Sequence, residues 1–342
     1  MTPGDELPDH VRTFLRSGSI AQYATVSAAG MPIDTPVLYF PSEDLRSFNL
    51  ATGLSYPAKA ERARRNPRVG LYLEGGPDEP VVSIAGMAAV RDADLQDNVN
   101  RYVAEACYTL PYDPPWELAR QAVWYWTRII VEITPVQILW WDRPADMDGP
   151  PQRWEAPPGT SYRPSDPAPP GKVSAAAKWD MPAWRDLAGQ ALARGARGHV
   201  SVCTAAGFPL PAGLRQVELV EDGFLLDVPG GIAWPLSGPA CLTFGGIETF
   251  LGRISGHGAR HHLAVERTLP IFPMTQDMAQ LWHPTPDTRA QLMRRLEEEL
   301  LRRGQPVPTV PETRPPPSEG YRRRLLRMGK SIEGEKAPPK RG

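Results

Sequence analysis

The stretch FNLATGLSYPAKAERARRNPRVGLYL, residues 48–73, decides the fold prediction. It reads as a strand, a polar turn, a short helix and a second strand. Pro57 suits the first helical position, where an N–H would have no partner in any case. Asn66 precedes a proline and so avoids the helical conformation, which ends the helix before the next strand. This reading places Lys59 in the first turn of the helix.

A lysine at this end of a helix needs an explanation. The N-terminus carries partial positive charge and favours an anion by roughly 0.3–1 kcal/mol. The free backbone N–H groups of the turn, the hydroxyls of Thr52 and Ser55 and the Lys59 ammonium would converge on one point, an arrangement that holds a phosphate. A surface lysine balanced by Glu61 accounts for the spacing equally well.

The order of predicted elements occurs twice along the chain. ATVSAAGMPIDTPVL, residues 24–38, is similar to SVCTAAGFPLPAGLR, residues 201–215, and both place an apolar strand before an Ala-Ala-Gly turn. Many short strands with few helices in each half fit closed β-barrels, which leave no sheet edge exposed. The sequence therefore predicts a mainly β fold with peripheral helices, made of two tandem β-barrels.

Proline marks the boundaries of these units. The chain has 40 prolines in 342 residues, and they concentrate in two stretches without helical or strand periodicity. We expect a first barrel over residues 1–143, a Pro-rich linker over 144–178, a second barrel over 179–304 and a Pro-rich, basic tail over 305–342. The tail reads as a solvated segment, with a binding arm as the alternative.

Composition excludes several classes of protein. The net charge of -1 creates no field that would draw the chain to nucleic acid or anionic lipid. Three cysteines without CxxC spacing argue against a disulfide framework and a structural zinc site. No apolar run is long enough for a signal peptide or a spanning helix. We expect a cytoplasmic protein with a small-molecule substrate, acting as a monomeric pseudo-dimer or a homo-oligomer.

Residues 48–73 and the hairpin before them resemble the pyridoxamine 5′-phosphate oxidase-like superfamily of FMN-binding split β-barrels. The helix that ends in Asn-Pro-Arg-Val and leads into a strand carries much of this likeness. Two positions depart from the family pattern, because Ala58 stands where an arginine is common and Phe40 where a basic residue is common. The resemblance implies that FMN binds to Thr35, Pro36, Val37, Leu50, Ala51, Thr52, Ser55 and Lys59, with Lys59, Thr52 and Ser55 at the phosphate.

The second half lacks the corresponding cation. No Lys or Arg occurs between Asp227 and Gly246, so this half should not hold a flavin phosphate. Split barrels of the family usually work as homodimers with the flavins at the subunit interface. The resemblance therefore implies two tandem split β-barrels that form a pseudo-dimer. We expect one cofactor site per chain, with the second barrel as the structural partner.

Two other features leave alternatives open. His257, His261 and His262 raise the possibility of a metal or haem site, although neighbouring residues of a strand point to opposite faces. Trp124-Tyr125-Trp126 and Trp140-Trp141 could stack on a planar ligand or pack in the core. We predict no metal ligand and assign no catalytic residue.

The resulting functional hypothesis is a flavin-dependent oxidoreductase. FMN would transfer hydride to or from an unidentified small molecule at the barrel interface. A deazaflavin coenzyme is the nearest variant. The alternative from another class is a non-catalytic flavin- or haem-binding protein that acts as a sensor.

Overall fold

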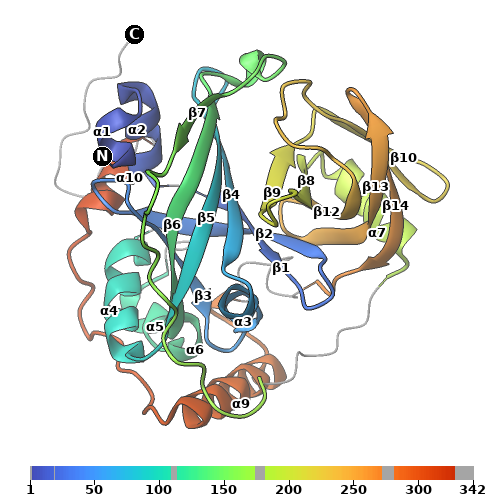
Figure 1. Cartoon of the computed structure of the whole chain (residues 1–342). Coiled ribbons are helices and arrows are strands. Elements are labelled where there is room, and N and C mark those ends of the chain that lie inside the picture. The colour runs from blue at the N-terminus through green and yellow to red at the C-terminus, as the bar shows by residue number, and fades with distance from the viewer. Residues whose placement is uncertain (1, 19, 109–113, 174–181, 272–280, 328–342) are drawn as a thin grey trace.

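The computed structural model describes residues 2–18, 20–108, 114–173, 182–271 and 281–327. Figure 1 shows two β-barrels side by side, with most of the helices on the first. The helix α9 (Pro286–Arg303) follows the second barrel in sequence but lies below the first barrel. The described helices include none that is long and apolar enough to cross a membrane.

The first barrel is a closed antiparallel sheet. Its strands run in the order β3-β2-β1-β4-β5-β6, and β3 pairs with β6 to close the ring. The side chains that fill it include Tyr23, Leu71 and Ile84, all at most 1% exposed. The strands are β1 (Ile20–Val26), β2 (Pro32–Pro41), β3 (Phe48–Gly53), β4 (Arg68–Glu74), β5 (Val81–Arg91) and β6 (Arg128–Trp141).

Short helices cover the outside of the first barrel. The strand–helix–strand unit predicted from residues 48–73 is present, with α3 between β3 and β4. Residues 116–126 contain two short helices in succession. The helices before α7 are α1 (Pro3–Glu6), α2 (Asp9–Arg16), α3 (Ala58–Arg65), α4 (Leu95–Ala106), α5 (Trp116–Ala119) and α6 (Val123–Trp126), with the 3-10 turn η1 (Pro144–Asp146) after β6.

The second barrel repeats the strand order of the first. Its sheet runs β10-β11-β14-β13-β12-β8-β9, which is the cyclic order of the first barrel opened at one place. The opening arises because the counterpart of the long β2 is broken into β9 and β10 around Leu214. Its elements are α7 (Trp184–Ala193), β8 (Gly198–Cys203), β9 (Pro209–Gly213), β10 (Gln216–Leu219), β11 (Gly223–Asp227), β12 (Gly238–Phe244), β13 (Glu248–His257) and β14 (Arg260–Thr268). The predicted class, mainly β with two split barrels, is confirmed.

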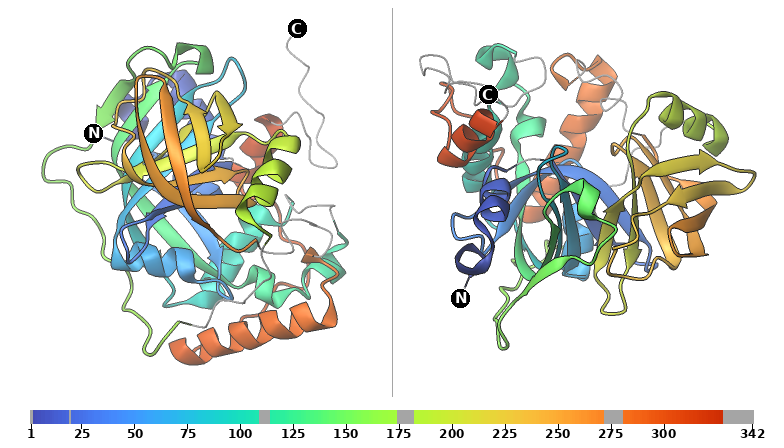
Figure 2. Two further views of the ribbon diagram at one scale, coloured as in Figure 1. Left: turned by 90° about the vertical axis from the view of Figure 1, so that its right-hand side faces the viewer. Right: turned by 90° about the horizontal axis from the view of Figure 1, so that it is seen from above.

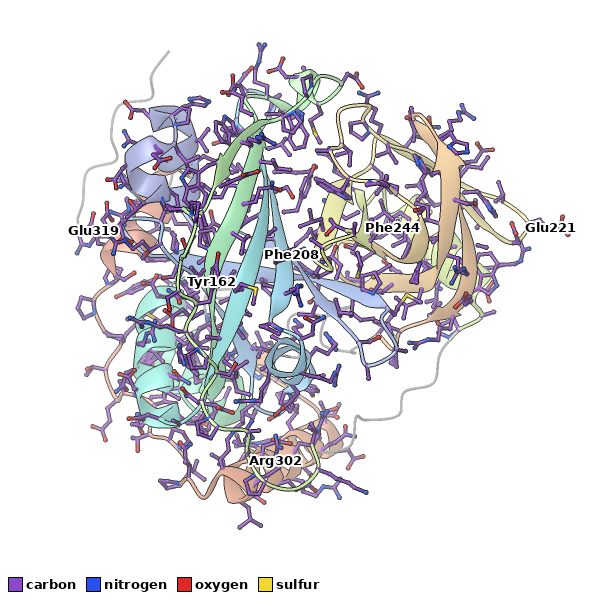
Figure 3. The ribbon with its side chains drawn as sticks, in the orientation of Figure 1. Tyr162, Phe208, Glu221, Phe244, Arg302 and Glu319 are labelled. Carbon is purple, nitrogen blue, oxygen red and sulfur yellow. The ribbon has the colours of Figure 1, made fainter. Side chains whose placement is uncertain are left out.

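The two barrels share a core and touch backbone to backbone. Tyr72, Val81 and Leu139 of the first barrel lie in one hydrophobic cluster with the interior of the second. A Cβ on Gly70 would lie 1.8 Å from the carbonyl oxygen of Pro209, so only glycine permits this approach of β4 and β9. Figure 3 shows Phe208 between the barrels, and the guanidinium of Arg68 lies 6.0 Å from its ring centroid.

The expected linker is more ordered than its composition indicates. Within residues 144–173, β7 (Gln152–Glu155) adds a strand to β6. Farther on, the Asp166 carboxylate accepts hydrogen bonds from the backbone N–H groups of Asp92 and Ala93. Long-range pairing of this kind leaves no periodicity in the sequence. Residues 152–155 and Asp166 pair with the first barrel, whereas Met147 and Asp148 contact the second.

The boundaries expected for the second barrel and the tail need correction as well. Leu292, Leu296 and Leu300 of α9 lie in the core of the first barrel, although residues 179–304 were expected to form the second. In the expected tail, α10 (Glu319–Arg327) packs on the first barrel through the buried Tyr321 and Arg324. The views in Figure 2 agree that both helices lie on the side of the first barrel. Residues 328–342 fall outside the described part.

Candidate cofactor site

The predicted phosphate turn lies at the junction of β3 and α3. Pro57 is the N-cap of α3, and Lys59 is its second residue. The Thr52 hydroxyl lies 3.5 Å from the backbone oxygen of Tyr56, at the limit of a hydrogen bond. Thr52 and Lys59 therefore flank one short turn, as the sequence predicts.

Ser55 is placed differently from its prediction. Its side chain is fully buried, and its hydroxyl donates a 3.2 Å hydrogen bond to the backbone oxygen of Leu292 on α9. In this structure Ser55 holds α9 against the turn instead of facing a ligand. The sequence gives no sign of this contact, because the partners lie 237 positions apart.

The other predicted contact residues divide between the core and the barrel interface. Leu50 and Val37 are buried in the core of the first barrel, so any contact with a ligand would come from their backbone. Ala51, next to Leu50 on β3, is half-buried. Pro36 packs against the second barrel, where a Cβ on Gly246 would stand 2.0 Å from its Cδ. Thr35 has a buried hydroxyl oxygen without a partner among the described residues.

Lys59 is part of a half-buried cluster of cations. Burial, together with the neighbouring Arg62 and Arg128, lowers the pKa of Lys59 to about 8. Lys59 makes no hydrogen bond or ion pair with any residue of the described ranges. Arg62 donates from Nε to the Thr25 hydroxyl over 2.7 Å. Like charges held this close in a poorly solvated place repel one another, and a bound anion would relieve that repulsion.

Arg128 is a site residue that the sequence analysis missed. It opens β6 opposite Gly53, and a Cβ on Gly53 would lie 3.3 Å from one of its terminal nitrogens. Its guanidinium carbon lies 4.5 Å from the ring centroid of Tyr102 and 4.4 Å from that of Tyr125. Arg128 forms no ion pair within the described part of the chain, and its buried Nε has no partner there. Its pairing with the strand that ends at the phosphate turn is the signal that could have identified it.

Most of the aromatic candidates are core residues. Trp124 and Trp126 lie in the first core together with Trp140, and Trp141 lies in the core shared by the barrels. Tyr125 is half-buried between Arg128 and Trp282. Core packing therefore accounts for the tryptophans, while Tyr125 faces the cation cluster.

Asp34 connects the cation cluster to the second barrel. It lies on β2 and is fully buried, with its Oδ2 3.2 Å from the Ser201 hydroxyl of β8. Burial raises the pKa of Asp34 to about 6, against the opposing effects of His199, Ser201 and Lys59. Its Oδ1 has no hydrogen-bond partner in the described residues. Asp34 can therefore hold or release a proton close to neutral pH beside the cation cluster.

The corresponding place on the second barrel is filled by side chains. The hairpin similarity makes Gly213 the counterpart of Pro36, and a Cβ on Gly213 would stand 2.0 Å from the carboxylate of Glu74. Glu74 accepts from the Tyr72 hydroxyl over 2.8 Å and pairs with Arg197 over 3.0 Å and with His199 over 3.3 Å. Residues 228–237, between β11 and β12, contain no helix and no cation. The two halves thus share strand order but differ at the site.

The histidines of the second barrel do not form a cluster. His261 and His262 lie on β14 opposite Leu226 and Leu225 of β11, and the His262 ring lies 2.8 Å from the Asp222 carboxylate. Among the described residues there is no group of three or more His, Cys, Asp or Glu that could hold a metal ion. Lys59 and Arg128 instead suit an organic phosphate, because neither forms an ion pair within the described part of the chain.

Comparison with known proteins identifies the first barrel. Residues 7–138 match the family model described as pyridoxamine 5′-phosphate oxidase. A search of curated proteins found no match. The family assignment therefore comes from the matched residues, which include β1 to β5, α3 and most of β6.

Solved structures with local similarity cover a similar share of the chain. General stress protein 26 from Bacillus anthracis is 19% identical over 43% of this chain and 99% of its own, with a TM-score of 0.30. A conserved hypothetical protein from Mycobacterium tuberculosis is 24% identical over 39% and 82%, with a TM-score of 0.32. A pyridoxamine 5′-phosphate oxidase-related, FMN-binding protein from Nostoc punctiforme is 16% identical over 37% and 75%, with a TM-score of 0.28. Residues 7–138, which contain most of the first barrel, are thus similar to the pyridoxamine 5′-phosphate oxidase family, and the second barrel repeats the strand order of the first.

Proposed function

We propose that this protein is a flavin-dependent oxidoreductase with one flavin site, on the first barrel. The observation that carries the proposal is the half-buried cluster of Lys59, Arg62 and Arg128, in which Lys59 and Arg128 form no ion pair with the described residues. The cluster surrounds the turn at which the family binds its cofactor phosphate. FMN and a deazaflavin coenzyme both carry a phosphate, and either fits this chemistry.

Each group of residues would have a separate role in the site. Lys59 and Arg128 would hold the phosphate, and the Thr52 hydroxyl would donate to it. The backbone of β2 at Thr35–Val37 would line the ring, and the second barrel would exclude water from its other side. A bound flavin would supply hydride transfer, and Asp34 could hold a proton at the barrel interface. The substrate would be a small molecule that enters at the barrel interface.

The substitution Lys59→Ala tests the phosphate assignment. We expect it to weaken FMN binding at least tenfold, about 1.4 kcal/mol, because it removes a charge-assisted contact. Binding of riboflavin, which has the same ring and no phosphate, should stay unchanged. Flavin fluorescence titrations of both ligands measure this, with the exposed lysine variant Lys172→Ala as the control. Equal FMN affinity in Lys59→Ala and wild type would remove Lys59 from the site.

The lowered pKa of Lys59 makes a separate prediction about pH. Phosphate binding requires the protonated lysine, so FMN affinity should fall as pH rises through about 8, where free Lys59 loses its proton. The phosphate itself is a dianion above about pH 6 and does not change in this range. FMN titrations at pH 7, 8 and 9 should show this decline in wild type and not in Lys59→Ala. A parallel decline in both proteins would assign the pH effect to another group.

A further inference from the structure

Arg295 on α9 is a buried cation without an anionic partner among the described residues. The residue is 9% exposed, and it forms no hydrogen bond or ion pair with the described part of the chain. Its Nε is fully buried and unpartnered there. Its guanidinium faces the ring of Tyr56, whose centroid lies 4.5 Å from the guanidinium carbon.

Tyr56 belongs to the phosphate turn, so Arg295 lies directly beside it. The helix is fixed there at two points: the Ser55 hydroxyl donates to Leu292, and the Arg302 guanidinium lies 2.6 Å from the Glu61 carboxylate. Arg295 lies between these points, three residues after Leu292 and therefore on the same face of α9. Figure 3 shows Arg302 farther along the same helix, below the first barrel. The position of Arg295 is thus set by contacts on both sides of it.

The contact with Tyr56 does not account for this burial. Removing a guanidinium from water costs more than a cation–π contact returns, unless an anion or several hydrogen-bond acceptors replace the water. Elsewhere on α9 the buried arginine Arg303 follows this rule, because Asp92, Glu61 and Glu299 surround it. Arg295 has no carboxylate partners of this kind among the described residues.

We infer that Arg295 binds the anionic end of the cofactor, so that the helix following the second barrel completes the phosphate site of the first. This inference rests on the proposed function. Arg295 lies 236 positions after Lys59 in the sequence. Its cation makes the docked helix α9 part of the binding site. It is a binding residue for the phosphate-bearing side chain and takes no part in the chemistry at the ring.

The test compares FMN with riboflavin in wild type, Arg295→Ala and Arg294→Ala. Arg294 is the matched control, because it is the exposed neighbour of Arg295 on the same helix. We expect Arg295→Ala to bind FMN at least tenfold more weakly and riboflavin within twofold of wild type, and Arg294→Ala to match wild type for both. If Arg295→Ala does not fold, Arg295→Gln is used instead, because glutamine is a long side chain without the charge. Its binding of FMN and riboflavin is then compared with that of wild type.

The outcomes separate this inference from the proposed function. If wild type binds FMN and Arg295→Ala or Arg295→Gln binds it equally well, Arg295 is not a phosphate residue, while the flavin site stands. If the variant loses FMN and riboflavin to the same extent, Arg295 only positions α9 and the inference is overturned. If wild type binds neither FMN nor a deazaflavin coenzyme, the proposed function itself fails. If only the deazaflavin coenzyme binds, the same variants are compared with that coenzyme in place of FMN and its unphosphorylated chromophore in place of riboflavin.

Discussion

Replacing Arg303 with alanine should destabilise the docked helix α9 by about 3 kcal/mol, the lower end of the range for breaking a buried ion pair. Arg303 is 2% exposed, with its Nε 3.0 Å from Asp92, and it also contacts Glu299 and Glu61. Its loss leaves the buried carboxylates of Asp92 and Glu299 with fewer cations. We take the lower end because Arg64 still pairs with Asp92 over 2.8 Å and Arg302 with Glu299 over 2.9 Å.

Denaturant unfolding and limited proteolysis measure this effect. We expect cleavage within α9 before the rest of the first barrel is attacked, because the lost contacts join α9 to α3 and to the loop after β5. The exposed arginine variant Arg294→Ala should behave as wild type. An Arg303→Ala protein with unchanged unfolding and an uncleaved α9 would show that the ion pairs do not hold the helix in place.

Replacing Gly70 with alanine should also destabilise the protein, by about 1–3 kcal/mol, the range for overpacking a tight contact. The new Cβ would meet the carbonyl oxygen of Pro209 at 1.8 Å, and this obstacle is backbone, which cannot rotate away. The second barrel would have to move away from the first. Because Asp34 bonds to Ser201 across the same interface, this movement should also alter the surroundings of the proposed site.

Gly189 supplies the control for this substitution. It lies in α7, and a Cβ there would have nothing within 4 Å. Gly189→Ala should therefore be neutral or stabilising by about 0.5–1 kcal/mol, since alanine favours a helix over glycine. Thermal or denaturant unfolding of both variants gives the comparison. If Gly70→Ala were as stable as wild type, the backbones of β4 and β9 would not approach each other as closely as in this structure.

Local patterns in the sequence predicted the first barrel and the phosphate turn. Proline and Asn-Pro placed the ends of α3, and the position of Lys59 at the start of that helix indicated a phosphate site. The repeated Ala-Ala-Gly hairpin predicted the second barrel. The strand–helix–strand unit and the second barrel are confirmed, because each depends on residues that are close in sequence, while the phosphate site stays a prediction.

The parts that sequence analysis missed depend on contacts between distant residues. Arg128 and Arg295 reach the phosphate turn through strand pairing and helix docking, and Ser55 turns to α9 for the same reason. The ends of the helix α9 do carry local signals. Thr285 caps its start, Pro286 follows, and Gly304 ends the helix with φ 62°. Nothing local indicated that it packs on the first barrel instead of the second.

The number of FMN molecules bound per chain tests the central claim most directly. Isothermal titration of the full chain at pH 7 should give one site, because the first barrel has the cation cluster while the counterpart on the second is filled by Glu74, Tyr72, Arg197 and His199. A deazaflavin coenzyme titrated in the same way should also give one site if it is the natural ligand. Two sites per chain, or no binding of either ligand, would contradict a single phosphate-anchored flavin site on the first barrel.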